Sequence, residues 1–256
     1  MNILITIWSL WCFLITLLVF LLLFPFNLIL IFCLGDFGRK VFVSYNFYVA
    51  NILLFLYGMR KKINGFYPFN HKGPCVYVVN HKSYLDVIII ASLVKQKIKY
   101  LGKAEVFKWP LFGFLAKHSG QIPVQREDKE SRNKGYELMK SAINDGFSII
   151  LFPEGGWKNK GDKKSSNPYS LKENQLLHDF RNGAFRLALE TEVPIVPIVL
   201  FNAQERFSDV NMQVIPGEIK LHVLNFINSD KFDDSFELNH KCYNLMHKLL
   251  KKHHSS

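Results

Sequence analysis

The sequence predicts an α/β domain with a largely parallel sheet flanked by helices, preceded by an N-terminal membrane-embedded helical segment. Two observations lead to this prediction. Residues 1–35 contain no acidic or basic side chain, whereas after Gly65 short β-rich runs alternate with stretches of helical periodicity. Such alternation is typical of α/β layer folds whose strands run mostly parallel. We therefore expect two parts: residues 1–64 embedded in the membrane, and residues 65–256 forming the α/β domain.

The composition excludes several classes of protein. Of the 256 residues, 49% are hydrophobic and 23 are Phe, which is too apolar for a disordered chain, and 21% are charged, which is too many for a polytopic transporter. The net charge of +11 arises entirely after residue 35. The four cysteines are scattered, so we expect a reducing compartment rather than a secreted disulfide framework. A membrane-attached globular protein fits these observations.

The charge-free segment is longer than one straight membrane span requires. A helix over its whole length would extend about 50 Å, against a hydrocarbon core of about 30 Å. Pro25 and Asn27 interrupt the apolar run, so a kinked, tilted helix and a helix with a re-entrant return both stay open. A cleaved signal peptide is disfavoured, because no basic residue precedes the run and no small-x-small site follows it.

A second apolar stretch, residues 41–59, has basic residues at both ends. Because positive flanks favour the cytoplasmic side, we expect this stretch to dip into or lie along the inner leaflet, with a second span as the alternative. The α/β domain is then expected on the cytoplasmic side of the cytoplasmic membrane. The flanking residues are Arg39, Lys40, Arg60, Lys61 and Lys62.

The α/β part contains five predicted strands with helices between them. Functional residues are expected where these strands end, because loops there lead into helices. Residues 157–170 are expected to be an exposed loop, serving as a lid, a headgroup-attracting arm or a solvated insertion. The predicted strands are residues 76–79, 98–101, 122–124, 148–152 and 195–201; the predicted helices are residues 83–94, 110–119, 130–145 and 182–191, followed by an amphipathic helix at 239–251 that packs on the domain or touches lipid.

The first candidate for chemistry follows the strand at residues 76–79, where the chain reads Asn-His-Lys-Ser-Tyr-Leu-Asp. His81 and Asp86 would lie about 500° apart on one helix and so on different faces. They can meet if His81 precedes the helix and Asp86 occupies its first turn, where the helix dipole keeps a carboxylate ionised. The carboxylate would then orient His81 as a neutral base, although an incidental polar loop is the alternative.

Two further candidates also lie at strand ends. Phe-Pro-Glu-Gly ends at Gly155, and its Glu154 and backbone N–H groups can grip a polar substrate or a developing oxyanion. Arg126 leaves the strand at residues 122–124 and can bind a phosphate through its planar guanidinium. The alternative for Arg126 is a surface ion pair with Asp128 or Glu130.

Together and in this order, these motifs resemble the lysophospholipid acyltransferase family, which includes the 1-acylglycerol-3-phosphate acyltransferases. The resemblance covers roughly residues 77–200. Its hallmarks here are His81-x4-Asp86, the stretch from Gly120 to Arg126, Phe152 to Gly155, and the apolar residues 193–198; Lys103, Pro110, Gly113 and Asn182-Gly183-Ala184 also match the pattern.

The resemblance implies transfer of a fatty acyl group from acyl-CoA or acyl-carrier protein to the sn-2 hydroxyl of lysophosphatidate, giving phosphatidate. It implies His81 and Asp86 as catalytic residues and Arg126, Glu154, Gly155 and Lys103 as substrate-binding residues, with no cofactor beyond the acyl donor. The implied partners are membrane lipids, a lysophospholipid acceptor and the donor. Lysines 95, 97, 99, 103 and 108 are expected around the active edge, where they would attract these anions.

One departure bears on the acceptor. Where the family usually continues Phe-Pro-Glu-Gly with Thr-Arg-Ser, this chain reads Gly-Trp157-Lys158. Another lysophospholipid or a lyso-amino-acid lipid therefore stays open as acceptor. A lipid hydrolase or a non-catalytic membrane module is disfavoured, since no Gly-x-Ser-x-Gly elbow occurs and the motif residues are present. No motif for a structural metal or for nucleic-acid binding occurs either.

Overall fold

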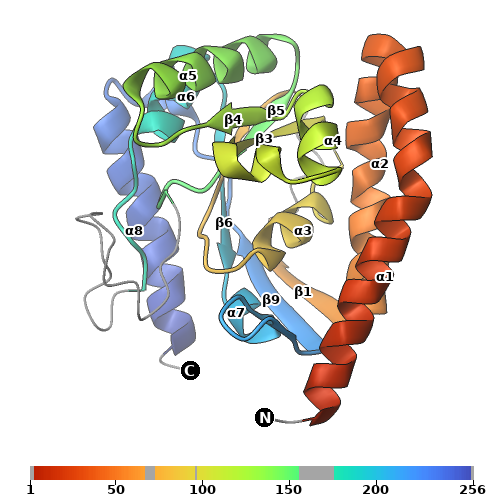
Figure 1. The fold of residues 1–256 in the computed structure, drawn as a ribbon. Helices are drawn as coiled ribbons and strands as arrows, with labels where there is room; N and C mark the ends of the chain where they lie inside the picture. The colour runs from red at the N-terminus through yellow and green to blue at the C-terminus, as the bar shows by residue number, and fades with distance from the viewer. Residues whose placement is uncertain (1–2, 67–72, 96, 156–175, 255–256) are drawn as a thin grey trace.

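The N-terminal part of the computed structural model is a helical hairpin, and the model describes residues 3–66, 73–95, 97–155 and 176–254. Helix α1 (Ile3–Leu28) continues as a π-helix, η1 (Ile29–Cys33), and α2 (Gly35–Leu56) returns beside it (Figure 1). Of the two arrangements left open above, the chain forms a helix followed by a return: α1 runs through Pro25, the geometry becomes π-helical at Ile29, and α2 then leads back. A proline removes one helical hydrogen bond, which a long apolar helix tolerates.

The α/β domain is built on a seven-stranded sheet with the order β1-β9-β6-β2-β5-β3-β4. The five strands from β6 to β4 in this order run parallel, β9 is antiparallel to β6, and β1 is parallel to β9. The largely parallel sheet is therefore confirmed. The strands are β1 (Met59–Gly65), β2 (Val76–Val79), β3 (Ile98–Lys103), β4 (Ile122–Val124), β5 (Ser148–Leu151), β6 (Ile195–Leu200) and β9 (Gly217–Val223).

Strand β1 corrects the predicted extent of the helical segment. Residues 59–64 were assigned to the membrane-embedded part, yet they pair with β9 at the edge of the sheet. The physical reason is alternation: Met59 is buried while Arg60 and Lys62 are exposed or half-exposed, as in a strand with one face covered. Of the basic residues expected as a membrane flank, Arg60 and Lys62 are thus outer positions of an edge strand, whereas Lys61 points inward and donates to Asn51 Oδ1 at 2.6 Å.

Helices cover both faces of the sheet (Figure 1). The alternating side chains of β2 divide the core, because Tyr77 and Val79 face one cluster while Val76 and Val78 face the other. The hairpin, α3 (Leu85–Ala91), η3 (Ala104–Lys108) and α4 (Phe112–His118) accompany the first cluster; α5 (Lys129–Asn144), α6 (Gly183–Glu190) and α8 (Ser235–His254) accompany the second.

Shorter elements complete the chain. They are α7 (Ala203–Arg206), the two-stranded sheet of β7 (Phe207–Ser208) and β8 (Gln213–Val214), and η4 (Ser229–Lys231). The predicted packed terminal helix is confirmed, since Leu238, Cys242, Met246 and Leu250 of α8 are buried.

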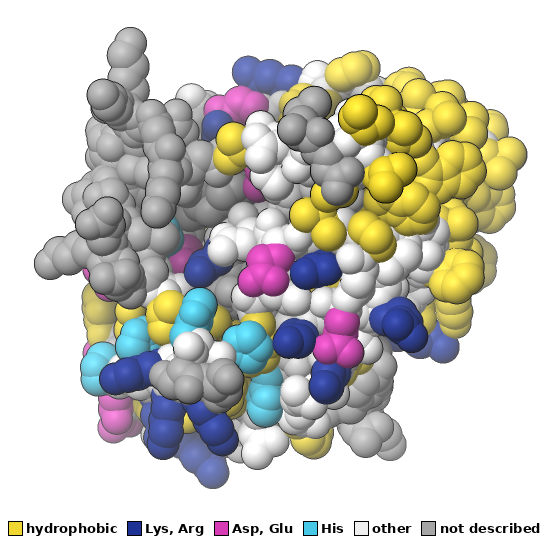
Figure 2. All heavy atoms as spheres, turned by 90° about the horizontal axis from the view of Figure 1, so that it is seen from below, with side chains coloured by type: hydrophobic (Ala, Val, Ile, Leu, Met, Phe, Trp, Pro, Cys, Tyr) yellow, Lys and Arg dark blue, Asp and Glu magenta, His cyan; other side chains and the backbone are white. Residues whose placement is uncertain are grey.

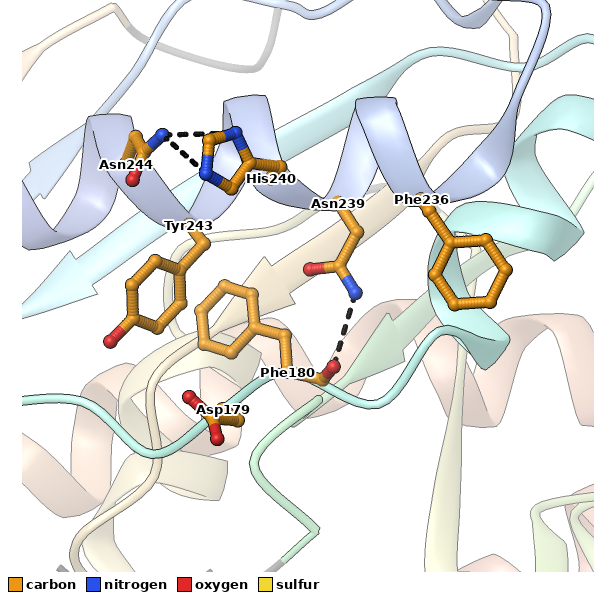
Figure 3. A pocket seen from close by; sticks show the side chains of 7 residues that line it. All are labelled: Asp179, Phe180, Phe236, Asn239, His240, Tyr243 and Asn244. Carbon is orange, nitrogen blue, oxygen red and sulfur yellow. Dashed lines mark hydrogen bonds between the residues drawn. The ribbon is translucent and has the colours of Figure 1, made fainter.

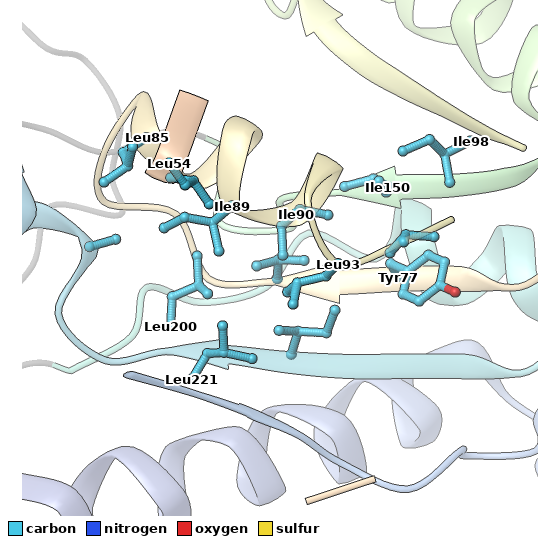
Figure 4. Packing of buried hydrophobic residues seen from close by; sticks show 14 of the residues in the cluster. Leu54, Tyr77, Leu85, Ile89, Ile90, Leu93, Ile98, Ile150, Leu200 and Leu221 are labelled. Carbon is cyan, nitrogen blue, oxygen red and sulfur yellow. The ribbon is translucent and has the colours of Figure 1, made fainter. Parts of the chain in front are cut away.

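Helix α3 is held firmly on the sheet. Its Ile89 and Ile90, with Leu93 just beyond its end, lie fully buried over Tyr77, Leu200 and Leu221 of three strands (Figure 4). Burying such side chains contributes about 1.5–3 kcal/mol each. Because the loop before α3 carries His81, this packing fixes the position of the candidate site.

Candidate active site

The carboxyl ends of β6, β2 and β5 lie next to one another, because these three strands are parallel neighbours in the sheet. Asn80 and His81 follow β2, and the Phe-Pro-Glu-Gly motif follows β5. Asn80 ties the first loop to β6: its Nδ2 donates to the carbonyl oxygen of Leu200 at 2.9 Å, and its Oδ1 accepts from the Leu200 N–H at 2.8 Å. The sheet thus brings two of the predicted motifs together.

His81 and Asp86 meet as predicted. The Nδ1 atom of His81 lies 2.8 Å from Oδ2 of Asp86, which stands in the first turn of α3. The same Oδ2 accepts from the backbone N–H groups of Lys82 at 2.8 Å and Ser83 at 3.0 Å. Asp86 is 1% exposed and His81 is 7% exposed. The carboxylate therefore fixes both the imidazole and the loop that carries it.

The residues after β5 complete the support of His81. The ring of Phe152 stacks on the imidazole, with the centroids 3.9 Å apart and the planes 20° from parallel. Oε1 of Glu154 accepts from the His81 N–H at 2.8 Å, and Oε2 accepts from the His178 N–H at 2.9 Å. Burial raises the pKa of Glu154 to about 7, and the hydrogen bonds from these two N–H groups lower it in part.

These contacts change the roles expected for Glu154 and Gly155. Glu154 is 1% exposed and both of its carboxylate oxygens accept from backbone N–H groups, so it holds the backbone of His81 in place. The Gly155 N–H, expected as an oxyanion donor, already donates to the Phe152 carbonyl oxygen at 3.0 Å. Gly155 has a φ of +78°, a left-handed conformation that closes this turn and favours glycine.

Arg126 approaches the same turn from the end of β4. Its Nη1 donates to the carbonyl oxygen of Gly155, and burial lowers its pKa. The alternative ion pair with Asp128 is not formed, because Asp128 caps α5 by accepting from the N–H groups of Glu130 at 3.2 Å and Ser131 at 2.9 Å. Arg126 therefore joins the site from a third strand.

The expected lysine cluster is only partly at this edge. Lys103 ends β3 beside Val124 of β4, is exposed, and has its Nζ 3.4 Å from Oε1 of Glu105. Lys95 and Lys97 precede β3, and Lys99 Nζ lies 4.6 Å from the ring centroid of Phe147, which precedes β5. Lys95, Lys97 and Lys99 thus lie before or near the beginning of β3, whereas the active edge is formed by the carboxyl ends of the strands. The prediction that places these three lysines at the active edge is therefore wrong.

Sequence reasoning missed three contributors to the site: Asn80, the backbone N–H of His178, and the backbone N–H of Arg181, which donates to the carbonyl oxygen of Pro153 at 2.9 Å. Asn80 had a signal, because a buried amide directly after a buried strand needs partners. The other two lie just after residues 156–175, and nothing local in the sequence indicates that they return to the motif after β5. Trp157, Lys158 and the predicted loop at 157–170 lie outside the described residues.

A hollow of about 280 Å³ lies between α8 and the segment leading into α6. The side-chain amide of Asn239 on α8 joins the two sides of the hollow by donating to the carbonyl oxygen of Phe180 at 3.1 Å (Figure 3). Its lining residues include neither His81 nor Asp86: they are Asp179, Phe180, Phe236, Asn239, His240, Tyr243 and Asn244.

Several known proteins are similar to this chain in sequence. A 1-acyl-sn-glycerol-3-phosphate acyltransferase of Brassica napus chloroplasts (BAT2) is 34% identical over 127 residues, which cover 50% of this chain and 33% of the relative. One from Limnanthes alba is 27% identical over 78% of this chain and 67% of the relative. A lyso-ornithine lipid O-acyltransferase of Rhodobacter capsulatus is 31% identical over 42% of this chain and 37% of the relative.

The matched segment of this chain spans about a third of the length of the first two curated relatives, at 33% and 36%. The crystal structure of the 1-acyl-sn-glycerophosphate acyltransferase PlsC from Thermotoga maritima superposes with a TM-score of 0.79 at 17% identity, covering 100% of this chain and 98% of that one. The fold is therefore shared. The model of the acyltransferase family matches residues 60–201, from β1 to the end of β6. The chain belongs to the acyltransferase family.

Proposed function

We propose that the protein is a 1-acylglycerol-3-phosphate acyltransferase, which moves a fatty acyl group from acyl-CoA or acyl-carrier protein to the sn-2 hydroxyl of lysophosphatidate and forms phosphatidate. The observation that carries this proposal is the 2.8 Å contact between His81 Nδ1 and Asp86 Oδ2 at the carboxyl edge of the sheet. An imidazole held in this way is a general base for a hydroxyl nucleophile.

The reaction follows from this geometry. His81 Nε2 takes the proton of the acceptor hydroxyl as its oxygen attacks the carbonyl carbon of the thioester. Asp86 keeps the other ring proton on Nδ1 and stabilises the imidazolium that forms. When the tetrahedral intermediate collapses, the carbon–sulfur bond breaks and the imidazolium returns the proton to the leaving thiolate. The products are phosphatidate and the free thiol of the carrier.

Direct transfer to the acceptor agrees with the state of Cys75, which lies at the opposite end of β2 from His81. Cys75 is fully buried just before β2, and burial raises the pKa of its thiol to about 11. A thiol in that state is a poor nucleophile near neutral pH, so we assign no acyl-enzyme step to it. Because the donor thioester is already activated, the proposed reaction needs no metal or cofactor.

The hairpin supports attachment to a membrane. Among the described residues, one helix, Ile3–Cys33, is long and apolar enough to cross a bilayer by length and composition. Apolar side chains gather on the side of the molecule where α1 lies (Figure 2), and many residues of α1 are exposed. We propose that the hairpin anchors the domain on the cytoplasmic face, where Arg39 and Lys40 favour its placement.

The loop before α4 extends this apolar surface. Trp109, Leu111 and Phe112 are 41–50% exposed, and Phe114 contacts Phe32 of η1 with ring centroids 5.9 Å apart. Exposed aromatic side chains beside an apolar helix are typical of an interface with lipid headgroups. The loop is therefore proposed to rest in the same leaflet as the hairpin.

A second acceptor class is favoured by two observations: the relative whose name specifies lyso-ornithine lipid, and Trp157-Lys158 where the family usually has arginine. The test is an acceptor screen with the purified full chain in liposomes, supplying acyl-CoA and acyl-carrier protein separately. We expect phosphatidate from lysophosphatidate. Turnover of lyso-ornithine lipid with none of lysophosphatidate would replace the first candidate with the second.

A further inference from the structure

A second arginine lies against the turn after β5. The N–H of Arg181 donates to the carbonyl oxygen of Pro153 at 2.9 Å, which attaches the segment before α6 to this turn. The guanidinium lies so close to Gly155 that a Cβ added there would be 2.6 Å from Nε and 2.9 Å from Cζ of Arg181. A side chain at this position would displace the guanidinium, and the positive φ of Gly155 would strain the backbone as well.

Two guanidinium groups therefore converge on one residue. The guanidinium of Arg126 donates to the carbonyl oxygen of Gly155, and the guanidinium of Arg181 packs against the Cα of Gly155. Burial and then the charge of Arg181 lower the pKa of Arg126, as expected for two cations held near each other, while the charges of Glu127 and Glu105 act in the opposite direction. Within the described part of the chain, neither arginine forms an ion pair with a carboxylate. Such an arrangement is stabilised by an anion that binds both groups.

The pair lies beside the catalytic base. Gly155 directly follows Glu154, whose carboxylate holds the backbone of His81. In lysophosphatidate, the phosphate and the free hydroxyl are carried on neighbouring carbons of glycerol. A phosphate bound at Gly155 would therefore present its hydroxyl on the side where His81 stands.

We propose that Arg126 and Arg181 together bind the phosphomonoester of the acceptor, with Arg181 supplying the second guanidinium that residues 156–158 lack. This inference rests on the proposed function and adds a specificity-determining residue to it. A phosphomonoester carries close to two negative charges at neutral pH, whereas a phosphodiester carries one. Two arginines match the doubly charged group, so the pair selects lysophosphatidate over lysophospholipids whose phosphate is esterified twice.

The test compares Arg181→Gln with Arg186→Gln, using the full chain in detergent micelles. Arg186 lies on α6, is exposed, and forms its ion pair with Glu190 at 2.7 Å, so the control removes the same charge a short way along the chain. Arg181→Gln is expected to raise the KM for lysophosphatidate by about 10- to 100-fold, with a smaller change in kcat and none in the KM of the thioester. The KM for lysophosphatidylglycerol should change much less, and Arg181→Lys should recover part of the loss.

A binding measurement separates this inference from the proposed function. Glycerol 3-phosphate is expected to raise the Tm of the wild type and of Arg186→Gln, and to leave the Tm of Arg181→Gln unchanged. If the wild type transfers no acyl group to lysophosphatidate yet shows this pattern, the anion site stands and the proposed function falls. If Arg181→Gln keeps the wild-type KM and the wild-type shift in Tm, the role assigned to Arg181 is overturned.

Discussion

The backbone N–H of His81 donates to the Glu154 carboxylate at 2.8 Å, although 73 positions separate the two residues in the sequence. The second oxygen of Glu154 holds the N–H of His178 at 2.9 Å. One buried side chain therefore joins the loop after β2 to the segment that leads into α6. The position of the His81 imidazole, the proposed general base, depends on this long-range contact as well as on its neighbour Asp86.

Glu154→Gln tests that dependence. An amide keeps one acceptor oxygen but turns an NH₂ group toward the other backbone N–H, which is left without a partner. We expect a loss of about 1–3 kcal/mol in the free energy of unfolding and a fall in kcat with little change in either KM. Urea unfolding and steady-state kinetics of the purified variant measure both effects. A variant with raised KM and unchanged kcat would show that Glu154 binds substrate instead.

The pH dependence of stability also follows from Glu154. Burial raises its pKa from 4.5 to about 7 in the folded state. Between these values the folded protein holds a proton that the unfolded chain has released, so the free energy of unfolding falls as the pH rises. The contribution is complete below about pH 4 and lost above about pH 7.

This prediction is measured by urea unfolding at a series of pH values. Glu154→Gln is the matched reference, because it lacks the titrating group. The free energy of unfolding of the wild type minus that of the variant should fall from pH 4.5 to pH 7. A difference that stays constant or rises over this range would show that the Glu154 pKa is not raised.

The loop before α4 is expected to enter lipid. Phe112→Cys, made with Cys33→Ser and labelled with a polarity-sensitive dye, should give a blue-shifted emission when anionic vesicles are added. Leu138→Cys provides the control. Leu138 is 44% exposed, which is similar to Phe112, but it lies on α5, on the other face of the sheet. Equal shifts at both positions, or none at Phe112, would contradict insertion of this loop.

The central strands were predictable because their signals are local. The runs that became β2, β5 and β6 are short, apolar and β-branched, as fully buried parallel strands are. The contact between His81 and Asp86 was predictable for the same reason, since it spans one loop and the first turn of a helix. Strand β9 had a clear alternation of Ile219, Leu221 and Val223 that the sequence analysis did not use.

Other features depend on contacts that no local pattern encodes. Strand β1 is recognisable only once β9 provides its partner. The contacts of Glu154 and Arg181 arise where the segment before α6 returns to the turn after β5, which the spacing of the motifs does not reveal. The lysines were misplaced because charge was counted along the chain without asking which end of a strand each residue occupies.

The most direct test of the proposed chemistry is the kcat of His81→Ala for acyl transfer to lysophosphatidate in liposomes. The matched control is His118→Ala, since His118 is a half-buried histidine on α4 whose ring lies beside Phe32 and Phe114 and 2.8 Å from the Phe114 carbonyl oxygen, away from Asp86. Removing the base should lower kcat by about 10²–10⁴-fold while the variant stays folded and membrane-bound, and the control should keep wild-type activity. A His81→Ala protein that retains wild-type kcat would contradict the assignment of His81 as the general base.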